Sequence, residues 1–386
     1  MYLRTTRILQ NTFGGARGFG GAGGAGGAFG GAGGAGGAGG AGGAGGAGGA
    51  GGAGAGWGGP DSALDCAGSV TSRDGIVDAF SANDIRTPRM LEFDDPAALE
   101  HWEPWVRGTV IDCELQLGLA YRLDHPNETL TVAASGIDIA TLKRPPADKD
   151  LMQTQVELVI EYADLREERA AECLSQVPQL LTYWTSVVGL HASRTRWTLE
   201  LLAAAVRLAI SVEMRFKHAF AFPRPVLYSP QVQPMVLTPL HSSYPSGHST
   251  EAHTTANVLI HLMGETVDAP RSRTLLKLAG RAAINRTVAG MHFPIDSRAG
   301  QALGTSLAEY IVARCTGKNV CRHRAYDPTP TEVMGEDFLP PTTHNADKTV
   351  TGFTVGDASP APLAWRTGKT SDPLAWLWSK AQAEWS

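Results

Sequence analysis

A long glycine–alanine segment near the N-terminus limits how much of this chain can form a core. From about Gly14 to Gly59 the sequence consists almost wholly of Gly-Gly-Ala triplets. A glycine at every third position meets the collagen rule, but the segment has no proline to hold a collagen-like helix. Because it has high backbone entropy and nothing to bury, we expect residues 1–60 to form a disordered arm. About 325 of the 386 residues then remain, enough for one large domain or two small ones.

Charge and hydropathy exclude two classes of protein. The formal net charge is −5, so nucleic-acid binding, which normally needs a basic face, is not expected. The N-terminus MYLRTTRILQNTF has no apolar run long enough for a recognisable signal peptide. The most apolar stretch is interrupted by Glu200 and Arg207 and does not reach the ~20 apolar residues of a membrane span. We therefore expect a soluble protein and favour the cytoplasm as its compartment.

The cysteines do not indicate a disulfide framework. There are five of them, Cys66, Cys113, Cys173, Cys315 and Cys321, and an odd number argues against complete pairing. The last two enclose the short loop CTGKNVC and could pair in an oxidising compartment. Two reduced thiols are the slightly favoured alternative, and the sequence leaves both open.

Helical periodicity dominates the chain after Pro146. The segment DLMQTQVELVIEYADLREERAAECLSQ carries apolar residues at helical spacing. SRTRWTLELLAAAVRLAISVEMRFKHAF predicts a second long amphipathic helix. Three further helices are predicted in STEAHTTANVLIHLMG, RSRTLLKLAGRAAINRTVAG and DSRAGQALGTSLAEYIVARC. A run of helices with short connections predicts an all-α fold, a helical bundle.

The chain on either side of this core, which we place at residues 150–315, is less regular. Residues 61–149 contain short β-like runs, RGTVIDCELQLGLAYRL and ETLTVAAS, and are expected to pack on the core as a mixed region. Residues 316–386 are rich in Pro, Thr and Asp and predict a largely irregular tail, although AWLWSKAQAEW at its end predicts a docked helix. The sequence leaves open whether the protein is a homo-oligomer.

Three short stretches within the helical region carry cations and histidines at fixed spacing. They are Lys217-HAFAFP-Arg224-Pro225, then Tyr244-Pro245-Ser246-Gly247-His248, then Asn285-Arg286-TVAGM-His292-FPI-Asp296. Lys217, Arg224 and Arg286 would repel one another around one point unless an anion lay between them. Arginine suits forked contact with phosphate-like oxygens, and the Ser246 hydroxyl and Gly247 N–H at a helix start would add neutral donors. The alternative, three solvated side chains each paired with a carboxylate, is less favoured for the set in register.

The histidines of these stretches have two alternative interpretations. If the chain is helical there, His292 can face Asp296 across one turn, and the carboxylate would leave the other ring nitrogen free to attack or to bind a metal. The alternative for His292 is a histidine of the core whose ring nitrogens are hydrogen-bonded and which has no catalytic role. His248 and His253, with Glu251 between them, suggest zinc, but five residues turn a helix by about 140° past its start, so the rings diverge. We expect no zinc site.

The pattern K-x6-R-P, P-S-G-H and S-R-x5-H-x3-D resembles the signature of a superfamily. That superfamily joins type-2 phosphatidic acid phosphatases, bacterial non-specific acid phosphatases and vanadium-dependent haloperoxidases. This chain matches every position but one, with Asn285 in place of serine. The resemblance runs from Lys217 to Asp296 and implies the family's α-bundle. It also implies that His292 bonds to phosphorus, or to vanadium as its apical ligand, with His248 as the acid–base group on the opposite side.

The resemblance leaves two reactions and one binding role. With a phosphate ester as substrate, the site would hydrolyse it through a phosphohistidine; with vanadate as cofactor, it would oxidise a halide with hydrogen peroxide. In the haloperoxidase branch, a histidine seven positions before the acid–base histidine accompanies bromide oxidation, so His241 predicts a bromoperoxidase-like halide pocket. A plain loop histidine is an equal alternative. A non-catalytic phosphate-binding protein is the third interpretation.

The rest of the sequence favours the haloperoxidase branch. The lack of a membrane span disfavours the integral lipid phosphatases, and the lack of a signal peptide disfavours the secreted acid phosphatases. The interval between His248 and Asn285 is short, as in the compact phosphatases. We therefore expect a vanadium-dependent haloperoxidase-like enzyme, with a soluble phosphatase close behind.

Overall fold

The computed structural model describes residues 70–73, 75, 86–177, 180–318, 321–338, 352–358 and 372–386. The expected disordered arm, residues 1–60, lies outside the described residues. The chain divides into two units, residues 1–110 with 369–373 and residues 111–368 with 374–386. In the first unit, the short helix η5 (Pro96–His101) begins at Asp95, whose carboxylate accepts a hydrogen bond from the Ala97 N–H. All the motif residues belong to the second unit.

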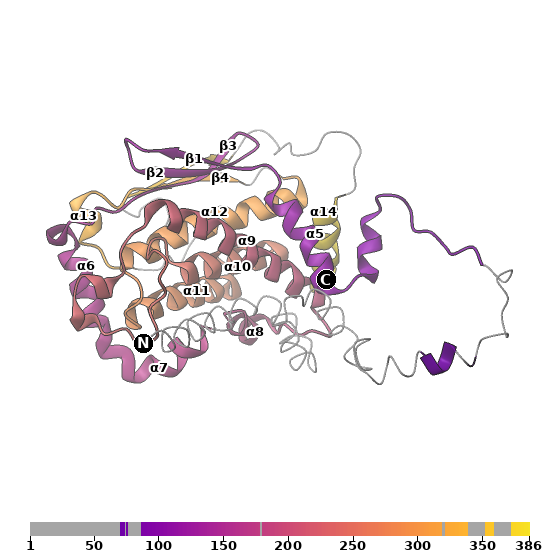
Figure 1. Ribbon diagram of the computed structural model, residues 1–386, viewed down its shortest axis with the longest axis horizontal. Helices are drawn as coiled ribbons and strands as arrows, with labels where there is room; N and C mark the ends of the chain where they lie inside the picture. The colour runs from indigo at the N-terminus through magenta and orange to yellow at the C-terminus, as the bar shows by residue number, and fades with distance from the viewer. Residues whose placement is uncertain are drawn as a thin grey trace. The chain divides into compact units, whose positions relative to one another are not determined.

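Four helices form the centre of the second unit, as the periodicity predicts. They are α9 (Arg196–Phe220), α10 (Gly247–Leu262), α11 (Pro270–Val288) and α12 (Pro294–Thr316), and α10 packs against the other three (Figure 1). Two glycines of α12 allow the closest of these approaches. A Cβ at Gly300 would lie 2.6 Å from the Ser246 carbonyl, and one at Gly304 would lie 2.3 Å from the Thr250 carbonyl. The start of α10 is therefore fixed directly against α12.

The remaining helices are shorter. They are α5 (Pro104–Gln116), α6 (Lys149–Glu161), η6 (Tyr162–Leu165), α7 (Arg166–Ser175), α8 (Thr182–Val188), η7 (Pro225–Leu227), η8 (Pro230–Val232), α13 (Thr331–Met334), α14 (Pro373–Gln382) and η10 (Ala383–Trp385). The predicted helix from residue 150 onward is divided into α6 and α7 by η6. No helix in the described parts of the chain is both long and apolar enough to cross a membrane.

The predicted C-terminal helix is confirmed, and it docks through named contacts. Glu384 accepts hydrogen bonds from the Trp197 and Thr198 N–H groups at 2.9 and 2.8 Å. These N–H groups have no partner within α9 because they belong to its first turn. The Trp376 ring meets the Trp197 ring edge to face, with centroids 5.2 Å apart. The end of the chain thus caps the helix that carries Lys217.

The all-α prediction is wrong, because the second unit also contains a five-stranded mixed sheet. Its strands are β1 (Leu119–Asp124), β2 (Thr129–Ala134), β3 (Ile137–Lys143), β4 (Arg322–Tyr326) and β5 (Phe353–Ala358), in the order β1-β2-β3-β4-β5. β3 and β4 run parallel, and the other neighbours are antiparallel. The sheet lies over α12, which contacts β3 and β4 (Figure 1).

The sheet was anticipated only in part: the β-like run ETLTVAAS contains β2, but β3, β4 and β5 were not predicted. β4 has the polar sequence RHRAY. It pairs with β3, with Ala140 opposite Arg324, although the helical region separates the two strands in the sequence. The buried Arg324 guanidinium bonds Glu309 of α12 at 2.9 Å, which ties the strand to the core. The β-like run RGTVIDCELQLGLAYRL is helical in its first half, α5, and extended only in β1. Cys321 is buried and carries a free thiol, and the Cys315 side chain is buried as well.

Candidate active site

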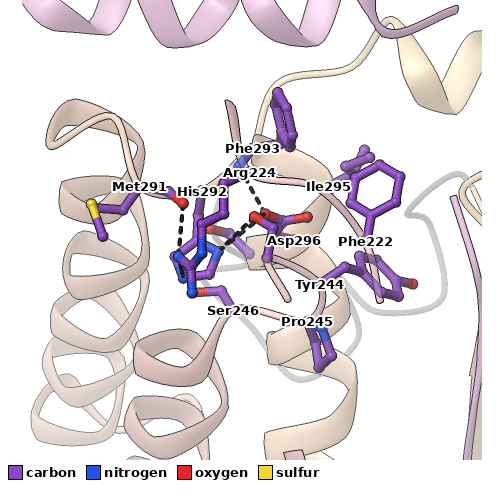
Figure 2. A network of polar contacts seen from close by, with 12 residues as sticks. Phe222, Arg224, Tyr244, Pro245, Ser246, Met291, His292, Phe293, Ile295 and Asp296 are labelled. Atoms are coloured by element: carbon purple, nitrogen blue, oxygen red, sulfur yellow. Dashed lines mark hydrogen bonds and ion pairs between the residues drawn. The ribbon is translucent and has the colours of Figure 1, made fainter. Parts of the chain in front are cut away.

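His292 and Asp296 are brought together by the start of α12. His292 precedes the helix, so the contact does not span a helical turn as the spacing suggested; Asp296 instead lies in the first turn. Its Oδ2 lies 3.1 Å from His292 Nδ1 and accepts hydrogen bonds from the Phe293 N–H at 3.0 Å and from the Ser243 hydroxyl. Figure 2 shows the dashed contacts converging on this carboxylate. Asp296 thereby caps the helix and orients the imidazole with one oxygen.

Burial sets the protonation of this pair. It raises the pKa of Asp296 to about 6, against the opposing effect of the bonds from Ser243 and Phe293. It lowers the pKa of His292 well below the ordinary value, and the nearby charges of Arg224 and Lys217 add to this. At neutral pH the imidazole is neutral. With its Nδ1 proton directed to the carboxylate, Nε2 keeps its lone pair.

Arg224 lies between two histidines. It follows α9 in extended conformation, and its NH1 lies 3.2 Å from His292 Nε2 while donating to the Met291 carbonyl at 3.0 Å. Its NH2 lies 3.1 Å from His241 Nδ1. Burial lowers the pKa of Arg224 to about 10, which still leaves it charged at neutral pH. His241, which is exposed, is therefore linked to His292 through one guanidinium.

Lys217, in the last turn of α9, lies beneath the loop that leads into α10. Its ammonium donates to the carbonyls of Ser242 at 3.1 Å, Ser243 at 3.0 Å and Pro245. Burial lowers the pKa of Lys217 to about 8, with Glu213 opposing the shift. The side chain thus holds the Pro-Ser-Gly-His loop in place. Its direct contact with an anion stays a prediction.

The first residues of α10 supply an unused donor and a close backbone approach. Ser246 is the N-cap of α10, and its N–H donates to the Asp296 carbonyl at 2.9 Å. Its hydroxyl is fully buried and has no hydrogen-bond partner among the described residues. A Cβ at Gly247 would lie 2.6 Å from Glu213 Oε1, so a larger residue would displace that carboxyl. A buried hydroxyl without a partner is costly, and a tetrahedral oxyanion at this helix start would satisfy it.

Arg286 and His248 meet at the end of α7. The Arg286 NH2 group donates to the Cys173 carbonyl at 2.8 Å and to Gln176 Oε1 at 3.0 Å, while its Nε has no partner among the described residues. His248 Nε2 lies 3.2 Å from the Gln176 carbonyl. Burial and then the Arg286 charge lower the pKa of His248 to about 3. A bound anion would offset that charge and return the pKa of His248 toward neutrality.

Two glutamates lie near the cations: Glu213 was not predicted from the sequence, and Glu251 was considered only for the zinc site that was rejected. Glu213 precedes Lys217 by four residues on α9, and Glu251 follows His248 by three on α10, so helical spacing could have found both. Burial, followed by the charge of Glu251, raises the pKa of Glu213 well above its ordinary value. Burial raises the pKa of Glu251 to about 7, against the charges of Lys217 and Arg286. Glu251 therefore holds a proton below neutral pH, and burial favours the protonated form of Glu213 as well.

Anion affinity is expected to fall as Glu251 ionises. Because its folded pKa is raised, the added negative charge appears as the pH rises through about 7. Sulfate, which keeps its charge in this range, should bind the wild-type protein about tenfold more weakly at pH 8 than at pH 6, since like charge opposes binding. Glu251→Gln should show a smaller fall in isothermal titration calorimetry, and the fall that remains comes from Lys217, whose pKa is lowered to about 8. Glu157→Gln, on the exposed face of α6, is the control, and an unchanged fall in Glu251→Gln would contradict the prediction.

His253 lies apart from this cluster. Its Nδ1 is 2.7 Å from the Ser249 carbonyl, and its ring meets Phe338 edge to face. Within the described residues no three His, Cys, Asp or Glu side chains are placed to hold a metal ion. The donor set fits an oxyanion instead, since the Ser246 hydroxyl and Arg286 Nε are buried without partners there.

A comparison with protein families gives an independent finding. Residues 197–320 match the family model described as the PAP2 superfamily. The matched segment begins in α9 and runs beyond the end of α12, so it contains all three motifs. No curated protein matches the chain significantly.

Proposed function

Because residues 197–320 are a PAP2 superfamily domain, we propose that this site binds a tetrahedral oxyanion and that His292 Nε2 bonds to its central atom. We propose further that the oxyanion is vanadate, and that the enzyme uses it to oxidise bromide with hydrogen peroxide. One observation carries this proposal. Lys217, Arg224, Ser246, Arg286 and His292 are each at most 5% exposed, although three of them are cations. Buried cations need a counter-charge. A small resident oxyanion supplies it.

Vanadate, when bound, supplies a Lewis acid that activates peroxide toward attack by a halide. The protein groups have separate tasks. Arg224 and Arg286 balance the anionic charge, and Ser246 donates to an oxygen. Asp296 holds the Nδ1 proton of His292, so that Nε2 remains a donor of its electron pair. His248 is less buried than these groups and would exchange protons with the substrate, and the exposed His241 is the residue assigned to the halide in this proposal.

The same donors suit a second candidate, a soluble phosphatase. A phosphate ester is tetrahedral and anionic like vanadate, so Arg224, Arg286 and the unpartnered Ser246 hydroxyl could hold it equally well. In that reaction His292 Nε2 attacks phosphorus and the ester P–O bond breaks. His248 gives its proton to the leaving oxygen, then accepts a proton from the water that cleaves the phosphohistidine. A non-catalytic phosphate-binding protein would bind the anion and turn over nothing.

One preparation tests the three functions. Loaded with orthovanadate and given peroxide and bromide, the protein should brominate a phenolic dye, with phosphate competing. Hydrolysis of nitrophenyl phosphate by the vanadate-free protein, with vanadate acting only as an inhibitor, would instead establish the phosphatase. Tight phosphate binding without either activity would establish the binding protein.

A substitution at His241 distinguishes the two proposed reactions. His241→Ala should change the dependence of bromination on bromide by about tenfold or more in KM, because a hydrogen-bonding group at the mouth is lost. Ester hydrolysis should change less than twofold, since the bond of Arg224 to the Met291 carbonyl remains and still holds the guanidinium in place. His218→Ala, an exposed histidine of α9, is the control. Equal effects on both reactions would remove His241 from a halide pocket.

A further inference from the structure

One residue outside the three motifs touches two of them. Gln176, just after α7, is 2% exposed. Its side-chain Oε1 accepts hydrogen bonds from Arg286 NH2 at 3.0 Å and from Asn285 Nδ2 at 3.1 Å. Its main-chain carbonyl lies 3.2 Å from His248 Nε2. A single residue at the C-terminal end of α7 therefore contacts both the Arg286 cation, assigned to the anion, and the proposed acid–base histidine.

We propose that Gln176 is a positioning residue of the active site, which fixes the Arg286 guanidinium through its side chain and the His248 imidazole through its main-chain carbonyl. The proposal rests on the proposed oxyanion chemistry. The guanidinium is held by two acceptors of the same segment, the carbonyl of Cys173 and Oε1 of Gln176, both on NH2. Its Nε is left as a buried donor without a partner among the described residues. That atom is therefore a donor available to an anion.

The amide suits this position because it is neutral and its orientation is fixed. Gln176 Nε2 donates to Glu172 Oε1 at 3.3 Å, and the Glu172 carboxylate is held by Arg281 at 2.6 to 2.9 Å. The amide oxygen is thereby directed to Arg286. A carboxylate here would pair with Arg286 and cancel the charge that attracts the anion. A neutral acceptor orients the cation and leaves its charge in place.

Asn285, the one departure from the family motif, belongs to the same arrangement. Its Nδ2 donates to Gln176 Oε1, and its Oδ1 lies within 3.4 Å of Arg169 NH1, also on α7. Serine has one hydroxyl on a shorter side chain and cannot make both contacts. Restoring the motif serine by Asn285→Ser is therefore expected to weaken anion binding in this chain.

The main-chain contact assigns the two nitrogens of His248. A carbonyl is only an acceptor, so Nε2 carries the proton that it shares with Gln176. Nδ1 is then the nitrogen left to exchange protons with the bound substrate. Displacing the end of α7 would change both the tautomer of His248 and its distance from the site.

The test measures phosphate binding by calorimetry, turnover against pH and thermal unfolding. Gln176→Leu removes the acceptor at nearly constant volume, and Gln176→Glu keeps an acceptor but adds charge. Both should weaken phosphate binding by about 10- to 100-fold, the effect of losing a hydrogen bond to a charged group or of cancelling its charge. Gln176→Glu should also move the limb of the pH profile that belongs to His248 upward by about one unit, because a negative charge favours the imidazolium. Asn257→Ala removes another buried amide, bonded only within α10, and should lower the unfolding temperature without changing phosphate affinity.

The outcomes separate this inference from the proposed function. If the wild-type protein binds phosphate and both Gln176 variants bind it equally well, the positioning role is wrong and the oxyanion site stands. If the wild-type protein binds neither phosphate nor vanadate, the proposed function fails, and this inference fails with it. Should Gln176→Leu not fold, Gln176→Glu decides: an unchanged pH profile and unchanged affinity in that variant overturn the proposal.

Discussion

Replacing His292 by alanine is expected to lower turnover by a factor of about 10⁴ or more, whichever of the two reactions the protein performs. The reason is that Nε2 is the only atom to which the proposed chemistry assigns a bond with the central atom of the oxyanion. Steady-state assays of bromination and of nitrophenyl phosphate hydrolysis measure the loss. Phosphate affinity should fall by less than about tenfold, because Arg224, Arg286 and Ser246 remain as donors.

The matched control for this variant is His253→Ala. His253 is also buried, but it bonds the Ser249 carbonyl and lies against Phe338. Its loss should reduce the unfolding temperature and leave turnover within about threefold of wild type, as expected of a packing change outside the site. Turnover in His292→Ala comparable to that of the control would remove His292 from the mechanism, and with it both catalytic readings of the site.

The helical centre could be predicted because its signals are local. The helices that carry the motifs, α9 to α12, each have apolar residues at a spacing set by their own backbone, and all pack around α10. The motif spacing also located the residues that the fold assembles, such as Arg224 beside His292 at 3.2 Å. Neither inference required knowledge of which helix lies next to which.

The rest depends on contacts between distant segments, which one sequence does not reveal. β4 becomes a strand only through its pairing with β3 and the bond of Arg324 to Glu309. Gln176 is an ordinary polar residue near the end of a predicted helix until α7 is placed beside α11. The buried state of Glu213 likewise follows from the position of Gly247 on the neighbouring helix. Helix-face spacing places Glu213 with Lys217, but it does not show that the carboxyl is buried.

Asp296→Asn is expected to reduce turnover by about 10³- to 10⁴-fold while leaving the fold intact. The carboxylate oxygen Oδ2 accepts from His292 Nδ1, from the Phe293 N–H and from Ser243. A neutral amide oxygen is a weaker acceptor than a carboxylate oxygen, and in its other orientation the amide presents its NH2 group to Nδ1, so the Nδ1 proton is no longer held with equal strength. The wrong tautomer of His292, with the proton on Nε2, would then become populated and could not bond to the oxyanion.

The pH dependence distinguishes this mechanism from a loss of stability. In the wild-type protein, activity should decline as the pH falls through about 6, because Asp296 becomes protonated and no longer accepts the Nδ1 proton. The residual activity of Asp296→Asn should lack this acidic limb of the pH profile. The folded state raises the pKa of Asp296, so ionisation of this carboxyl costs stability above pH 6, and its replacement by a neutral amide removes that cost. Asp148→Asn, the same change at the exposed cap of α6, is the control and should keep full activity. A surviving acidic limb in Asp296→Asn would show that another group, such as Glu251, controls it.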